Sequence, residues 1–330
     1  MARDTRMQPS TPCKRVVPAE RLVERVTFTE DVYVIAHLGI AQVDASDWRL
    51  HIDGMVERPF ALDHAALTSL PAVELTSVLA CFGNPLEPDI PTRQAANVVW
   101  RGARVADLLE RAGLRDGARL VWAEGLDHGS FFGAEADCYV KDIPLSRACE
   151  PDVLVAWDMN GRPLTAEHGY PARLVVPGYF GTHSVKWLTR LTVSDVRPDH
   201  LFTTRLYNRQ VIVDDQIVIE PARELDVQSI LVTPSDGARL ARGLHPIAGW
   251  AFSAYDIEAV DVSVDAGATW QPAQLGAPPA TGHEWQPFTH SFGPLPPGPY
   301  EICARATDAR GRIQPDDGRN AIHRVRVMVE

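Results

Sequence analysis

The 330-residue chain contains few cysteines, and their spacing forms no recognisable framework. No CxxC or CxxCH occurs, which argues against a zinc ribbon and against covalently attached haem. Because the number of cysteines is odd and they are widely spread, a reducing compartment is the simplest assumption. The five cysteines are Cys13, Cys81, Cys138, Cys149 and Cys303.

The chain also lacks an excess of positive charge and a long apolar run. Its formal net charge of −11 disfavours nucleic acid as a partner, because phosphate binding needs clustered Lys and Arg. No run of about 18 apolar residues exists, so no membrane span is expected. Residues 1–20 are polar and do not form a signal peptide, so the chain as written is expected to be cytoplasmic, or periplasmic if a signal was removed.

Three parts of different character follow one another along the chain. Residues 1–25 predict a mobile or loosely docked arm. Through residues 26–220, apolar runs alternate with short helical patterns such as 103–112, which predicts an α+β domain. In residues 221–330, short alternating segments recur with Gly, Pro and Asp between them, which is typical of a β-sandwich.

Residues that hold anions gather most densely in residues 160–188. Arg and Lys match phosphate by geometry and by charge, and glycine lets backbone N–H groups approach it closely. The apolar run 174–177 separates two polar clusters and predicts a buried strand, so both clusters are expected to meet at one ligand. A strand with charged flanks is the plain alternative. The polar residues are His168, Arg173, His183, Ser184 and Lys186.

This stretch resembles the molybdopterin-binding segment of the sulfite oxidase family. The matching positions are Met159-Asn160-Gly161, Pro163-Leu164, His168-Gly169-Tyr170-Pro171, Arg173, Val176-Pro177-Gly178, Gly181 and Val185-Lys186-Trp187-Leu188. The similarity runs from about residue 30 to the end. It implies a sulfite-oxidase-type molybdopterin-binding domain at 26–220 and an immunoglobulin-like dimerisation domain at 221–330, the latter matched at Gly249-Trp250-Ala251.

The resemblance also assigns roles to individual residues. Cys81 matches the cysteine whose thiolate binds molybdenum, although a cysteine at a strand end is often a buried structural thiol. Trp100 matches a residue bordering the substrate pocket, and Tyr207, 39 positions after His168, matches the active-site tyrosine. Cys81, Tyr207 and Trp100 are therefore the expected catalytic residues. The expected cofactor contacts are His37, Cys81, Asp127, His168, Arg173, His183, Ser184 and Lys186.

Several of these residues have a plain structural alternative. His37 stands in an apolar segment, where a histidine is often a satisfied core residue. Asp127 precedes His128-Gly129 and could simply form a turn. Trp100 could anchor the core, and Tyr207 lacks the usual flanking sequence DYK. His183 lies where many family members have arginine or another polar residue.

The resemblance implies one molybdenum–molybdopterin per chain, without nucleotide, and no haem in this chain. It implies two-electron oxygen-atom transfer, with water supplying or receiving the oxygen. Electrons would pass to or from a separate carrier such as a cytochrome, and the last domain implies a homodimer. The resemblance also implies a small-molecule substrate.

The cofactor-holding positions match the family, but the anion-holding ones do not. Ile35, Pro85 and Leu86 stand where the family has arginines. Three hypotheses stay open: sulfite oxidation, oxygen transfer on a less charged sulfur or nitrogen compound such as a sulfoxide, and a non-catalytic cofactor-binding or assembly module. Candidates to replace the missing cations are Arg93, Arg205 and Arg209.

Overall fold

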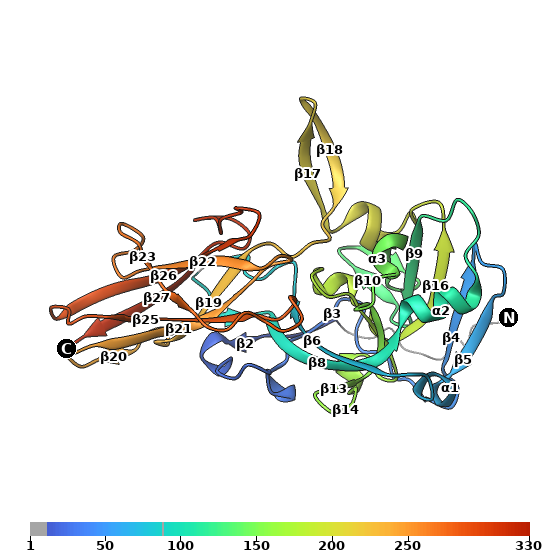
Figure 1. The fold of residues 1–330 in the computed structure, drawn as a ribbon, viewed down its shortest axis with the longest axis horizontal. Helices are drawn as coiled ribbons and strands as arrows, with labels where there is room; N and C mark the ends of the chain where they lie inside the picture. Colours follow the sequence, from blue (N-terminus) through green and yellow to red (C-terminus); the bar gives the residue numbers. More distant parts are fainter. Residues whose placement is uncertain (1–11, 88) are drawn as a thin grey trace. The chain divides into compact units, whose positions relative to one another are not determined.

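The computed structural model describes residues 12–87 and 89–330 (Figure 1). The arm predicted for residues 1–25 lies partly outside this range. Its described part forms β1 (Cys13–Arg15), β2 (Val17–Pro18) and a 3₁₀ turn. β1 pairs with β3 (Val34–Ala36) and β2 with β7 (Thr92–Arg93), so these residues are built into sheets.

The chain divides into two compact units that are not linear segments. Among the described residues, the first unit contains residues 12–15, 34–75 and 99–223. The second contains residues 16–33, 76–98 and 224–330. The linear boundary at residue 220 remains a prediction of domain organisation. The compact units differ from it because two early segments fold with the C-terminal part.

Hydrogen bonds to distant residues explain why residues 16–33 and 76–98 fold with the C-terminal part. The indole N–H of Trp250 donates to the carbonyl of Leu22 (2.6 Å), and that of Trp285 donates to the carbonyl of Arg25 (2.8 Å). The amide of Val78 donates to the carbonyl of His283 (2.7 Å). A cut at Pro221 would remove these partners, so it would not cleanly isolate the first unit.

Strands make up most of the regular secondary structure of the first unit. One sheet has the strand order β12-β9-β16-β4-β5, and a second has the order β14-β13-β8-β6, with β15 also paired to β13. The unit boundaries at 75/76 and 98/99 fall within β6 and β8. The strands are β4 (Arg49–Gly54), β5 (Phe60–Asp63), β6 (Val73–Ala80), β8 (Ala95–Arg104), β9 (Leu120–Gly125), β10 (Gly129–Phe131), β11 (Ala134–Ala136), β12 (Val140–Pro144), β13 (Leu154–Met159), β14 (Arg162–Pro163), β15 (Arg173–Val175), β16 (Leu188–Ser194), β17 (Asn208–Val213) and β18 (Gln216–Pro221).

The α-helices of the described chain are short: α1 (His64–Thr68), α2 (Val105–Ala112) and α3 (Leu145–Ala148). The helix predicted over 103–112 is confirmed as α2, which begins after the last residue of β8. Its apolar residues bury one face, and Gly113 ends it with φ 72°. Strands far outnumber these helices among the described elements, which does not establish the α+β class, so that class remains a prediction. No helix in the described range is both long and apolar enough to span a membrane.

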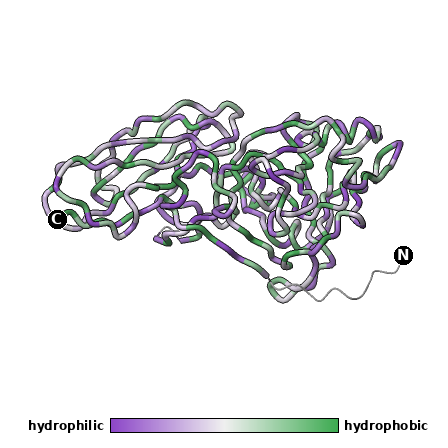
Figure 2. Tube along the Cα trace, turned by 90° about the horizontal axis from the view of Figure 1, so that it is seen from below, coloured by the Kyte–Doolittle hydropathy of each residue, from purple (hydrophilic) through white to green (hydrophobic). Residues whose placement is uncertain are grey.

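Two larger sheets form the second unit, with orders β19-β21-β25-β24 and β20-β27-β26-β22-β23. Apolar and polar stretches alternate along the chain (Figure 2). Val260 and Val262 are buried, as their alternation with polar residues predicts, and join a core drawn from both sheets. The strands are β19 (Gln228–Thr233), β20 (Arg239–Leu240), β21 (His245–Phe252), β22 (Ile257–Ser263), β23 (Gln271–Pro272), β24 (Gln274–Leu275), β25 (Gln286–Phe292), β26 (Gly298–Asp308) and β27 (His323–Val329).

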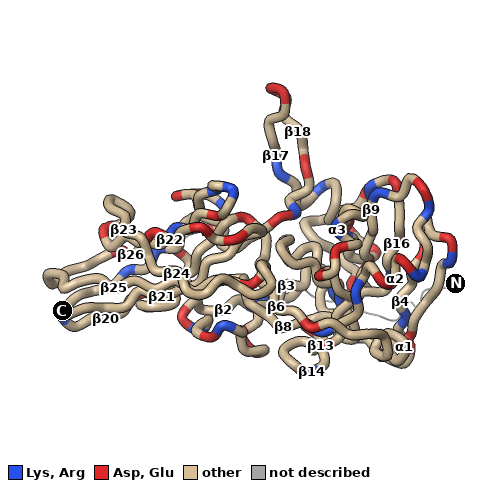
Figure 3. Tube along the Cα trace, viewed as in Figure 1, with Lys and Arg blue, Asp and Glu red and all other residues tan. Residues whose placement is uncertain are grey.

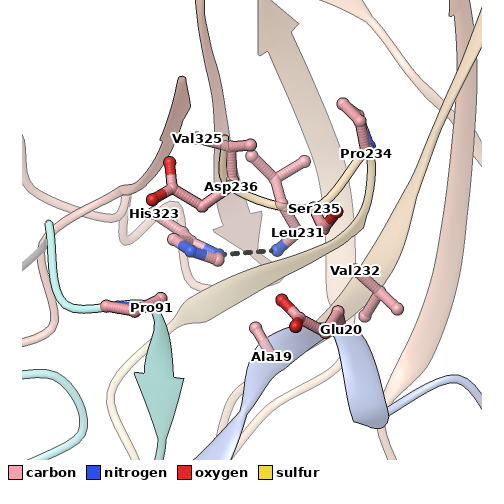
Figure 4. Close-up of a pocket in the computed structure, with 10 residues that line it drawn as sticks. All are labelled: Ala19, Glu20, Pro91, Leu231, Val232, Pro234, Ser235, Asp236, His323 and Val325. Carbon is pink, nitrogen blue, oxygen red and sulfur yellow. Dashed lines mark hydrogen bonds between the residues drawn. The ribbon is translucent and has the colours of Figure 1, made fainter. Parts of the chain in front are cut away.

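A small hollow opens beside His323 in the second unit (Figure 4). The side chains of Glu20, Asp236 and His323 contribute to its lining. Its volume of about 10 Å³ leaves room for one water molecule at most. The hollow is therefore too small for a cofactor.

His323 makes stability depend on pH. Its imidazole Nδ1 accepts a hydrogen bond from the Leu231 amide (3.0 Å), and burial, followed by the charge of Arg93, lowers its pKa well below the usual value. Below pH 6.5 the unfolded chain binds a proton that the folded chain does not, so stability falls as the pH falls. We expect this histidine to contribute a slope of up to about 1.4 kcal/mol per pH unit.

Urea unfolding at pH 7.5, 6.0 and 5.0 measures this slope in the wild type and in His323→Gln. Glutamine retains an acceptor for Leu231 but no ionisable group, so the variant should lose part of the slope. His51→Gln, at an exposed position of β4, is the matched control. An unchanged slope in His323→Gln would contradict the assignment.

Candidate functional site

The buried strand predicted between the two polar clusters is β15, and all three of its residues are buried. It pairs with β13, which places Arg173 opposite Ala156. The chain then returns alongside it: the amide of Leu174 donates to the carbonyl of Val185 (2.8 Å), and that of Leu188 to the carbonyl of Ala172 (2.9 Å). The residues before and after β15 therefore lie together, as the sequence predicts.

Arg173 joins the two clusters directly. Its guanidinium donates to the carbonyl of His168 (3.0 Å) and to the carbonyl of Ser184 (2.9 Å). Lys186 Nζ donates to the carbonyl of Glu167 (2.9 Å), making a second bridge. The hydroxyl of Ser184 accepts from the Val176 amide (3.2 Å). Four residues expected to contact the cofactor thus form one connected group.

Gly169 makes the close approach within this group possible. Its φ is +104°, and a Cβ placed there would lie 3.0 Å from Cβ and 3.1 Å from Cα of Lys186. A side chain at this position would push away the Lys186 segment. The glycine is therefore required by both the turn and the packing.

Buried polar atoms in the first unit lack hydrogen-bond partners among the described residues. They include Nε2 of His168, Oδ1 of Asp127 and the indole nitrogen of Trp100. The Trp100 ring lies 4.9 Å from the guanidinium carbon of Arg173. An unsatisfied buried polar atom costs roughly 1–3 kcal/mol, so this group is suited to a polar ligand that satisfies it.

Electrostatics favour an anion at the same place. Burial, then the charges of Arg173, Lys186 and Arg15, lowers the pKa of His168 to about 3, so its imidazole is neutral. Burial and the charge of Arg173 lower the pKa of Lys186. Burial raises the pKa of Asp127. Two cations held close together and partly desolvated are stabilised when an anion binds between them.

His37 and Tyr207 meet at a second point of the first unit. The Tyr207 hydroxyl is hydrogen-bonded to Nε2 of His37, and both rings pack against Phe202. Burial, then the charge of Lys186, lowers the pKa of His37 to about 4, so the imidazole is neutral near pH 7. Tyr207 adopts φ +61°, a left-handed conformation that only a few per cent of non-glycine residues adopt.

Lys141, which sequence reasoning missed, lies beneath Tyr207. Its side chain is fully buried, and its Nζ is 5.0 Å from the centre of the Tyr207 ring, without a hydrogen-bond partner in the described chain. Burial lowers its pKa to about 7. His183 is also buried, bonded to Thr182 (3.2 Å), and its pKa is lowered by burial and then by Lys141. Because the strand sequence VKDIP contains two charged residues, it gave no signal that this lysine is buried.

Cys81 belongs to the second unit, whereas the other nine predicted site residues belong to the first. It follows β6, and its amide donates to the carbonyl of Gln94 (2.9 Å) while its Sγ accepts from the Gly83 amide (3.5 Å). Buried Asn84 fixes the loop by donating to Gln228 (3.0 Å) and accepting from the Gln94 amide (2.7 Å). The partly buried thiol thus sits in a loop held by several hydrogen bonds.

The described residues contain no group of three or more His, Cys, Asp or Glu placed to hold a metal ion. Cys81 alone could therefore give a metal only one protein ligand. A metal there would need further donors from a cofactor, which is the chemistry that a dithiolene supplies.

The three apolar replacements occupy different surroundings. Ile35 is partly buried on β3, Pro85 is buried, and Leu86 is 63% exposed. Among the candidate compensating cations, Arg93 is buried and donates to the carbonyls of Ile90 and Thr92. Arg205 and Arg209 are exposed.

Comparison with known proteins gives matches over both parts of the chain. Residues 37–202 match the oxidoreductase molybdopterin binding domain, and residues 220–330 match the Mo-co oxidoreductase dimerisation domain. Sulfite oxidase of Gallus gallus is 34% identical over 94% of this chain and 73% of its own length. Mitochondrial sulfite oxidase of Homo sapiens is 33% identical over 94% of this chain, which spans 63% of that relative.

A solved structure is similar across nearly the whole chain. The sulfane dehydrogenase SoxCD from Paracoccus pantotrophus matches with a TM-score of 0.82 and 26% identity. The match covers 98% of this chain and 86% of the other. The molybdopterin match contains all predicted site residues except Tyr207, which lies five positions beyond its end at residue 202.

Proposed function

Because the chain belongs to the sulfite oxidase family of molybdenum-dependent oxidoreductases, we propose that it oxidises sulfite. The observation that carries this proposal is the buried group around Arg173, in which His168 and Asp127 have polar atoms without partners in the described chain. Cations and unsatisfied polar atoms side by side fit a ligand that has both a phosphate and a heterocyclic N–H edge.

The residues present fit one molybdopterin per chain, without nucleotide. Arg173 and Lys186 would pair with its phosphate, and Ser184 would add a hydroxyl. Asp127 and His168 would bond the polar edge of the pterin. Cys81 would be the protein ligand to molybdenum. When bound, the cofactor supplies two-electron oxygen-atom transfer.

The overall reaction converts sulfite and water into sulfate, two protons and two electrons. The Tyr207–His37 pair lies in the same unit as the expected cofactor residues other than Cys81. Neutral His37 can accept a hydrogen bond from the Tyr207 hydroxyl and so orient it, while the lowered pKa of His37 disfavours uptake of a released proton by its imidazole. The two electrons would leave singly to a separate carrier such as a cytochrome.

The proposed architecture is an α+β molybdopterin-binding domain followed by an immunoglobulin-like sandwich, with the chain acting as a homodimer. The two sheets of the second unit support the sandwich, and the dimerisation-domain match supports the homodimer. Trp100 would border the substrate pocket beside Arg173. His183 and Lys141 would lie behind Tyr207.

A second candidate is oxygen transfer on a less charged sulfur compound. Ile35, Pro85 and Leu86 in place of arginines favour a neutral ligand, since each lost charge-assisted hydrogen bond weakens dianion binding by roughly 1.5–3 kcal/mol. A solved structure similar to this chain is named a sulfane dehydrogenase, and not a sulfite oxidase, so similar chains are named for different sulfur substrates.

The test uses purified protein loaded with molybdenum cofactor. Sulfite is supplied with ferricyanide as electron acceptor, and dimethyl sulfoxide is supplied with a reduced viologen as electron donor. The proposal predicts a larger kcat/KM for sulfite. A larger value for the sulfoxide would favour the second candidate, and a loaded, redox-active protein that turns over neither would favour a binding or assembly module.

A further inference from the structure

The β17–β18 hairpin exposes an unusual amount of apolar surface. Its register pairs Ile212 with Ile217 and Gln210 with Ile219, so the three isoleucines share one face. Ile212 is 77% exposed, Ile217 is 68% exposed and Ile219 is 66% exposed. We call these three residues the isoleucine face. Adjacent exposed isoleucines on one strand pair mark an interaction site more often than scattered ones do.

The hairpin is a two-stranded ribbon with both edges unpaired in the described chain. In Figure 1 it extends away from the other strands of the first unit. Asp214 and Asp215 form its tip with φ of 50° and 61°, as a tight hairpin turn requires. Two strands alone are marginally stable in water, so a ribbon that buries neither face gains stability when a partner covers one.

The ribbon begins immediately after Tyr207. The amide of Ala222 donates to the carbonyl of Tyr207 (2.9 Å) and closes its base. Arg197 and Arg223 both pair with buried Asp142, which fixes the chain on either side of the ribbon. A protein seated on the ribbon would therefore lie on the unit that holds the Arg173 group and Tyr207.

Charge distinguishes the possible occupants. The tip carries two adjacent carboxylates (Figure 3), and the chain has a formal net charge of −11. A second copy would bring the same negative charge, whereas a basic partner would be attracted. Residues 220–330 match a dimerisation domain, so self-association is assigned to a part of the chain other than the ribbon tip.

We propose that the ribbon is the docking arm for the electron carrier, a basic redox protein whose apolar patch is ringed by lysines. The isoleucine face covers the apolar patch, and Asp214 and Asp215 pair with lysines at its rim. This inference rests on the proposed function for the carrier's role, but binding to the ribbon can be measured without turnover.

The experiment compares Ile212→Thr/Ile217→Thr/Ile219→Thr with wild type. Threonine keeps the strand preference, so the ribbon should persist while its face becomes polar. Calorimetry measures binding of a lysine-rich c-type cytochrome, and kinetics use sulfite with either that cytochrome or ferricyanide. We expect the cytochrome Kd and KM to rise about tenfold or more, with ferricyanide turnover unchanged. Asp214→Asn/Asp215→Asn should reduce the salt dependence of cytochrome binding.

Leu244→Thr, at a 71% exposed site of the second unit, is the matched control and should change neither constant. Unaltered cytochrome binding by the triple variant, or no binding by the wild type, overturns the proposal. Conversion of a wild-type dimer to a monomer by the triple variant, seen by light scattering, also overturns it and assigns the ribbon to a second copy. Absence of sulfite turnover with ferricyanide rejects the proposed function alone, and the calorimetry still decides the ribbon.

Discussion

Cys81→Ser is expected to abolish turnover while the protein remains folded. A serine hydroxyl is a poor ligand for a metal that a soft thiolate holds, and even indirect changes around metal ligands cost roughly 10–100-fold. The loss should therefore exceed about 100-fold. The loop itself should survive, because its hydrogen bonds run through the Cys81 backbone amide and the Asn84 side chain.

The measurement combines sulfite-dependent ferricyanide reduction, metal content and thermal unfolding. Cys149→Ser is the matched control, because Cys149 is an exposed thiol that follows α3 in the first unit. It should retain wild-type activity. A Cys81→Ser protein with normal turnover would show that the thiolate is not the ligand.

The local parts of the candidate site could be predicted from sequence. His168, Arg173 and Lys186 lie within 19 positions and meet because β15 is a short buried strand between two turns. The glycine at 169 and the apolar run were both visible. When contacting residues are this close in sequence, the local residue pattern is enough to predict that they meet.

Lys141 could not be predicted, because its burial depends on strand pairing. Its position on β12 opposite Ala123 of β9 follows from the register of the sheet. Nothing in a single strand sequence fixes that partner. The same reason explains why residues 16–33 and 76–98 were not assigned to the second unit. Their hydrogen-bond partners, the indoles of Trp250 and Trp285 and the carbonyl of His283, lie far away in the sequence.

The ribbon at 208–221 is an intermediate case. The alternation in NRQVIVDDQIVIE, with two aspartates at its centre, is a hairpin signal that sequence reasoning did not use. Its pairing was therefore predictable. Its exposure was not, because an apolar alternation normally indicates a face packed on a core.

Lys186→Met is expected to change cofactor binding and stability in different ways. In the cofactor-free protein, Lys186 is partly desolvated and repelled by Arg173, which lowers its pKa, so removing the charge should leave stability within about 1 kcal/mol of wild type or raise it. Cofactor binding should weaken about 10- to 100-fold, the loss of one charge-assisted hydrogen bond. Thermal unfolding of the cofactor-free protein and titration with molybdopterin measure the two effects.

Lys14→Met, at an exposed position of β1, is the control and should change neither stability nor cofactor affinity. A lysine that binds an anionic ligand is not needed for stability before that ligand binds. A variant that loses stability but retains normal cofactor affinity would therefore mean that Lys186 is a structural residue.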